Sequence, residues 1–124
     1  MSKAHMSIPV SQAIGDIMNQ AASQNPAASQ PVSIGFFKIQ NPASSHMDTK
    51  MSDLYAVQII PDMLAEYSEP IRVISESFSD AFAEALDDLL LLLEVFYQVR
   101  LSRPKDAVFT PSLGSDEVSR SSLI

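Results

Sequence analysis

Histidine, aspartate and serine are the residue types in this chain that could do chemistry, and their spacing favours no common type of site. The histidines are His5 and His46, and His46 lies two residues before Asp48 in a polar stretch. Two ligands in a mobile loop make a poor metal site, because a closed zinc site takes four ligands. Asp87 and Asp88 are adjacent, so on a helix their side chains point about 100° apart and do not form a catalytic pair.

The serines, the glycines and the absence of cysteine likewise favour neither a catalytic site nor a metal site. No serine stands in a Gly-x-Ser-x-Gly motif. The glycines Gly15, Gly35 and Gly114 form no phosphate-binding loop. The chain has no cysteine, which excludes disulfides, thiol catalysis and cysteine metal ligands. We therefore expect a protein that is not an enzyme and uses no cofactor or metal.

Charge and hydropathy restrict the class of partner. The formal net charge is -7, with 8 basic residues against 15 acidic ones, so nucleic-acid phosphates are not the expected ligand. The longest apolar run is Leu89–Leu93, far short of the roughly 20 residues of a membrane helix. No signal peptide is visible, and residues 1–5 resemble a remnant of cloning. We expect a soluble protein, cytoplasmic or exported without cleavage of a signal peptide.

The strongest secondary-structure signal predicts one helix over residues 70–102. Pro104 stops the pattern, because proline cannot continue a helix. The pattern itself is a recurrence of apolar residues every three or four positions. Its members are Ile71, Ile74, Phe78, Phe82, Ala85, Leu89, Leu92, Phe96 and Val99.

The second half of this predicted helix is apolar nearly all round. Even Leu91 and Val95 fall near the polar strip of Glu84, Asp87 and Gln98. A helix of this kind is normally buried on most sides, and a short chain offers little to cover it. We therefore expect a second polypeptide to pack here. The predicted interface comprises Phe82, Leu86, Leu89, Leu90, Leu93, Phe96 and Tyr97.

The two ends of the chain are expected to differ from its centre. Residues 8–22 place Val10, Ile14 and Ile17 on one helical face, which predicts a second, conditionally ordered contact. We assign residues 1–31 to an N-terminal amphipathic segment with a flexible linker, and residues 32–103 to a helical core. Residues 104–124 are rich in serine and are expected to form a flexible tail.

The middle of the chain supports two interpretations. Residues 34–40 are aromatic and β-branched, which favours a strand. Residues 52–67 fit a helix broken at Pro61, and this is the interpretation that we prefer. The alternative is an α+β fold in which residues 54–60 form a hairpin with residues 34–40. The expected fold class is accordingly mainly α.

The N-terminal segment resembles a known family. Residues 10–20 read VSQAIGDIMNQ and are followed by Asn25-Pro26-Ala27-Ala28. This arrangement over residues 10–28 is similar to the opening of bacterial R-body ("killing trait") subunits. The resemblance implies a self-assembling structural subunit without catalysis. The long acidic, leucine-rich helix departs from what that family leads us to expect.

These observations predict a non-enzymatic assembly or adaptor protein that acts through protein–protein contacts. Its partner is expected to be a further copy of itself, as a homo-oligomer, or another subunit of a larger complex. A second hypothesis is a secretion-system substrate or its chaperone. The serine-, alanine- and glutamine-rich start, with no acid before Asp16, resembles many uncleaved export signals.

Overall fold

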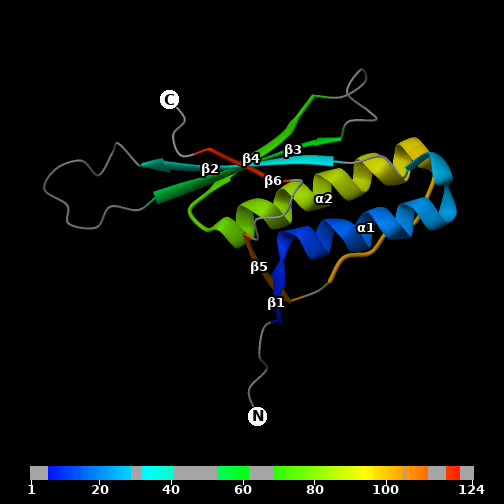
Figure 1. Ribbon diagram of the computed structural model, residues 1–124, viewed down its shortest axis with the longest axis horizontal. Helices are drawn as coiled ribbons and strands as arrows, with labels where there is room; N and C mark the ends of the chain where they lie inside the picture. Colours follow the sequence, from blue (N-terminus) through cyan, green and yellow to red (C-terminus); the bar gives the residue numbers. More distant parts are fainter. Residues whose placement is uncertain are drawn as a thin grey trace, which may run out of the picture.

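The computed structural model describes residues 6–28, 32–40, 53–61, 69–104, 106–111 and 117–120. These residues form two α-helices, one short 3-10 helix and two separate sheets. Both α-helices lie on the same side of the larger sheet (Figure 1). The elements, in chain order, are β1 (Met6–Pro9), α1 (Val10–Gln24), η1 (Pro26–Ala28), β2 (Val32–Gln40), β3 (Asp53–Pro61), β4 (Ile71–Ser75), α2 (Phe78–Tyr97), β5 (Ala107–Thr110) and β6 (Glu117–Arg120).

The larger sheet has the strand order β4-β3-β2-β6. β2 and β3 form an antiparallel pair in which Val32 lies opposite Pro61 and Phe36 lies opposite Val57. β4 adds to β3 in antiparallel orientation, and β6 adds to β2 in parallel. Proline has no N–H to give to a strand ladder, and Pro61 accordingly occupies the last position of its strand.

The smaller sheet joins the N-terminal end of the described chain to a strand that follows α2. β1 and β5 pair in parallel, with Met6 opposite Ala107 and Ile8 opposite Phe109. The backbone N–H of Phe109 also donates to the Ser79 hydroxyl oxygen at 2.9 Å, which ties β5 to the first turn of α2. Residues about 100 positions apart are thereby held together at one end of the helices (Figure 1).

The expectation of a mainly α fold is wrong, and the structure supports the α+β alternative. Residues 53–61 form strand β3, not a helix broken at Pro61, and they pair with β2 as a hairpin. The physical reason is that a strand over residues 34–40 leaves its backbone groups unsatisfied unless a neighbour pairs with them. β3 provides that pairing along the whole length of β2.

The predicted helix over residues 70–102 is also wrong at both ends. Residues 71–75 form β4, and the helix begins only at Phe78. Ser77 is the N-cap, and its hydroxyl oxygen accepts the N–H of Asp80 at 3.3 Å. The helix ends at Tyr97, because Gln98 adopts the left-handed conformation with φ 57° and ψ 50°.

Residues 104–124, which we expected to form a tail, contain two strands, β5 and β6. Phe109 of β5 is buried and packs edge-on against Phe82 of α2, with ring centroids 5.0 Å apart. This part of the chain therefore contributes directly to the core.

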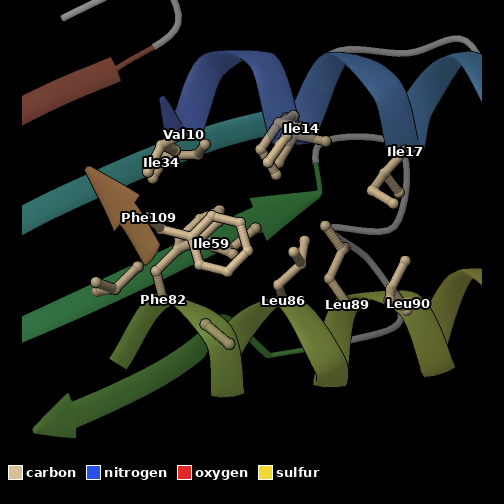
Figure 2. Close-up of a cluster of buried hydrophobic side chains, with 14 of the residues drawn as sticks. Val10, Ile14, Ile17, Ile34, Ile59, Phe82, Leu86, Leu89, Leu90 and Phe109 are labelled. Carbon is tan, nitrogen blue, oxygen red and sulfur yellow. The ribbon is translucent and has the colours of Figure 1, made fainter. Parts of the chain in front are cut away.

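The main core lies between the two helices and the larger sheet (Figure 2). Ile14 and Ile17 of α1 point toward Leu86 and Leu89 of α2, and Ile59 of β3 lies between the helices in this view. An aromatic cluster at the start of α2 extends the core, because Phe78 makes edge contacts with residues of both β2 and β3. The core is thus closed by elements of this one chain.

Candidate protein-contact surface

The structure places most of the predicted interface residues inside the chain's own core. Val10, Ile14 and Ile17 of α1 are buried. So are five residues of α2: Phe82, Leu86, Leu89, Leu90 and Leu93. The larger sheet and α1 cover the sides of α2 that we had expected a partner chain to cover. These side chains are consequently unavailable to a partner unless the fold opens.

The remaining two predicted interface residues lie at the C-terminal end of α2, beyond the densest part of the core. Phe96 is 47% exposed, and Tyr97 is partly buried. Their rings pack edge-on, with centroids 4.9 Å apart. Burial raises the pKa of the Tyr97 phenol above its ordinary value, because removal from water disfavours the charged phenolate.

The solvent-facing side of α2 carries the most exposed large apolar side chains in the described part of the chain. Leu91 is 62% exposed and Val95 is 72% exposed. They are four residues apart and therefore lie one above the other on the helix surface. Leu92 lies beside them and is partly buried. We call Leu91, Leu92, Val95 and Phe96 the α2 patch.

A shallow hollow marks the centre of the α2 patch. It has a volume of about 300 Å³ and is lined by Asp88, Leu91, Leu92 and Val95. A single carboxylate at the edge of an apolar hollow suits a contact with another protein better than a small-molecule site. Small-molecule sites usually enclose most of the ligand and offer several convergent polar groups. Asp88 is the one polar residue of this lining.

Acidic side chains lie on the solvent-facing side of α2 between the α2 patch and the N-terminus of the helix. Asp80, Glu84 and Asp88 recur every four residues and are all exposed. Asp87 lies on the neighbouring row and forms an ion pair with Arg103, in which Oδ1 is 2.6 Å from Nε. Exposed ion pairs of this kind add little stability, about 0–1 kcal/mol. Through this ion pair, residues 98–104 contact α2 at Asp87.

Residues 98–104, which we call the return segment, run back between the two helices. Gln24 and Gln20 of α1 hold this segment by hydrogen bonds to the backbones of Arg100 and Ser102. From the α2 side, a Glu94 carboxylate oxygen accepts the N–H of Leu101 at 2.7 Å. The return segment therefore covers the flank of α2 at Asp87 and Glu94, and the α2 patch lies beside it with Leu91 and Val95 exposed.

A second apolar surface lies on the side of the larger sheet that faces away from the helices. Side chains alternate along a strand, so the residues between the buried ones of β2 and β3 point to this side. They include Phe37, Leu54 and Ile60, each partly buried. Ile74 of β4 is more open, with 52% exposed. This face is less accessible than the α2 patch.

The other residues that could do chemistry are placed as follows. His5, His46 and Asp48 lie outside the described residues. Among the residues that the structure describes, no group of three or more His, Cys, Asp or Glu side chains is close enough to hold a metal ion. In the same part of the chain, neither α1 nor α2 is long and apolar enough to span a membrane.

Sequence reasoning identified part of this surface and missed the rest. The helical angle placed Leu91 and Val95 near the polar strip, and their exposure confirms that placement. The part played by Gln20 and Gln24 was missed, since glutamines four residues apart indicate only a shared helix face. Comparison of the chain with protein-family models, with curated proteins and with solved structures found no match.

Proposed function

We propose that this protein acts without catalysis, by binding another polypeptide through the α2 patch. The observation that carries the proposal is the exposure of Leu91 and Val95, at 62% and 72%, on a well-formed helix. Covering a large aliphatic side chain contributes roughly 1.5–3 kcal/mol when burial is complete. A partner that covers both residues gains that free energy without disturbing the core beneath them.

The position of the patch supports a contact with a folded or helical partner. Leu91 and Val95 form one row of the helix surface, and Leu92 and Phe96 form the next. Rows of this kind are the ridges that pack into the grooves of a facing helix. Leu89, Leu90 and Leu93 are buried just below and fix the helix in place. The patch therefore lies on a helix whose opposite side is anchored in the core.

This proposal includes the assembly or adaptor function and, of the second hypothesis of a secretion-system substrate or its chaperone, the chaperone. An assembly subunit, as the resemblance of residues 10–28 to R-body subunits implies, would use the patch to join its neighbours. A secretion chaperone would use it to hold a client. Both modes of action require a second polypeptide at Leu91 and Val95, so the same experiment tests them.

The experiment introduces a photo-activated cross-linking amino acid at Leu91 in the cells that make the protein. We expect covalent adducts with a second polypeptide after illumination. The matched control carries the same amino acid at Asp16, an exposed position of α1, and should give none. Circular dichroism of both variants verifies that they remain folded. Absence of adducts at Leu91, or equal adducts at both positions, would contradict the proposal.

A further inference from the structure

The two edges of β2 are covered to different extents. One edge pairs with β3 along the whole length of the strand. The other edge pairs in parallel with β6, and this ladder involves residues 34–37, which are four of the nine residues of β2. β2 is therefore held in the sheet by β3, and β6 is an addition to its outer edge.

The two strands that follow α2 differ in how they are attached to the fold. β5 forms a ladder with β1, and its Phe109 is buried against Phe82 of α2. β6, by contrast, makes its extensive contacts with β2 alone among the described helices and strands. The attachment of β6 is thus concentrated in one short ladder, whereas β5 is fixed on two sides.

A short parallel ladder at the edge of a sheet belongs to the part of a fold that opens at a low cost in free energy. When β6 separates, β5 still anchors the chain up to Thr110. The backbone N–H and C=O groups of residues 34–37 that faced β6 then lose their partners. Unpaired groups of this kind on an edge strand readily bind a strand of another chain.

We propose that the outer edge of β2 at residues 34–37 is a binding site for an extended segment of another polypeptide, and that β6 occupies this site within the chain. The inference goes beyond the proposed function, because it concerns the sheet and makes no use of the α2 patch. β6 itself shows which kind of ligand fits, namely an extended segment that runs parallel to β2. Main-chain hydrogen bonds supply the affinity of such strand addition.

The register of β6 indicates which residue types suit the site. Val118 lies opposite Gly35, and Arg120 lies opposite Phe37. Alternate residues of an added strand supply the specificity in this mode of recognition. The matching segment therefore carries an aliphatic residue and, two positions later, a basic one.

β6 competes with any external segment, because residues 111–116 connect it directly to β5. A short flexible connection gives an effective concentration on the order of millimolar. An external segment binds only the fraction of chains whose site is empty. If β6 is in place about nine-tenths of the time, the external segment binds about tenfold more weakly than it would to an empty site.

The test uses the full-length chain with prolines at two adjacent positions of β6, Val118→Pro and Ser119→Pro. The N–H groups of successive strand residues point to opposite sides, so one of the two prolines removes a donor to β2. A synthetic peptide of residues 113–124 is then titrated to millimolar concentration. We expect NMR shift changes at residues 34–37 of the variant, and the wild-type chain should need about tenfold more peptide. A peptide with the same two prolines is the control and should bind neither chain.

Amide exchange of the wild-type chain provides a second readout that requires no substitution. The N–H groups of residues 34–37 alternate between β3 and β6. Those that face β6 should exchange much faster than those that face β3, and much faster than the amide of Leu86 in the buried part of α2. Equal protection of the two sets would show that β6 does not separate from β2, and would overturn the proposal.

Three results of the titration would also overturn it. The first is an absence of shifts at residues 34–37 of the double-proline variant at millimolar peptide. The second is equal binding by the variant and the wild-type chain, because β6 would then not occupy the peptide's site. The third is unfolding of the variant, measured by circular dichroism, because β6 would then be an integral part of the fold.

Discussion

The side-chain amide of Gln24 brackets the backbone of Arg100, donating from Nε2 to the carbonyl oxygen at 2.7 Å and accepting the N–H through Oε1 at 2.9 Å. Gln20, one turn earlier on α1, makes the same pair of hydrogen bonds with the backbone of Ser102. Its Nε2 donates to the carbonyl oxygen at 2.9 Å, and its Oε1 accepts the N–H at 3.0 Å. The two amides satisfy four backbone groups of a segment that pairs with none of the strands in the described part of the chain. They take the place of a neighbouring strand.

Removing both amides should loosen the return segment. For the double variant Gln20→Ala, Gln24→Ala we expect a loss of about 1–2 kcal/mol in the free energy of unfolding. Each hydrogen bond is worth about 0.5–1.5 kcal/mol, and exposure to water keeps these at the lower end. Amide exchange should accelerate at Arg100 and Ser102. Gln12→Ala, at an exposed position of the same helix, is the control. Unchanged exchange at both amides would show that the glutamines do not hold the segment.

Neighbouring leucines of α2 should respond oppositely to the same substitution. Leu93 is 0% exposed and Leu91 is 62% exposed. In dilute solution, Leu93→Ala should cost about 2–5 kcal/mol, since it leaves a cavity in the core. Leu91→Ala should stay within about 0.5 kcal/mol, as is usual for surface changes. Urea unfolding of the two variants measures the difference. Equal losses would mean that Leu91 is buried within the monomer.

The start of α2 depends on one hydroxyl group. Ser77→Ala removes the oxygen that accepts the N–H of Asp80, and should reduce the free energy of unfolding by about 1 kcal/mol. Ser77→Asp keeps an acceptor at the same position and should retain most of the stability. Chemical denaturation of both variants is the measurement. A helix that began near residue 70 would place Ser77 in its interior, and the Ser77→Ala variant would then be more stable than the Ser77→Asp variant.

The end of α2 carries a backbone conformation that glutamine adopts at a cost. Gln98 has a φ of 57°, in the region that glycine enters without steric penalty. Gln98→Gly should therefore raise the free energy of unfolding by up to about 1 kcal/mol. Gln98→Ala keeps the β-carbon and should bring no gain. A loss of stability in the glycine variant would indicate that the glutamine side chain itself holds the turn.

The local pattern of the sequence determined where the two helices lie. In α1 and in the central part of α2, apolar residues recur at helical spacing, and those of the inner face are buried as the pattern predicts. Periodicity could not locate the start of α2, because Ile71, Ile74 and Phe78 also fit a helix. Apolar runs as short as that of β4 are compatible with either structure.

Tertiary structure alone decided between strand and helix in the middle of the chain. Residues 54–60 fit both, and the outcome depended on pairing with residues 34–40, which are distant enough in the chain that no local pattern reveals the register. A backbone strand needs a neighbour for its N–H and C=O groups, and that requirement is met only by a long-range partner. β4 was missed for the same reason, since it exists as an addition to β3.

Tertiary structure also decided which face of α2 is left for a partner. The sequence indicated that α2 has more apolar surface than a few helices could cover. It could not reveal that a sheet formed by other parts of the chain covers Phe82, Leu86 and Leu93. Burial depends on which segments meet in space, and these segments are brought together by the sheet register and by the pairing of β1 with β5. What the sequence alone did determine is that Leu91 and Val95 lie on the side of α2 that carries the charges, because side-chain angle around a helix follows from residue spacing alone.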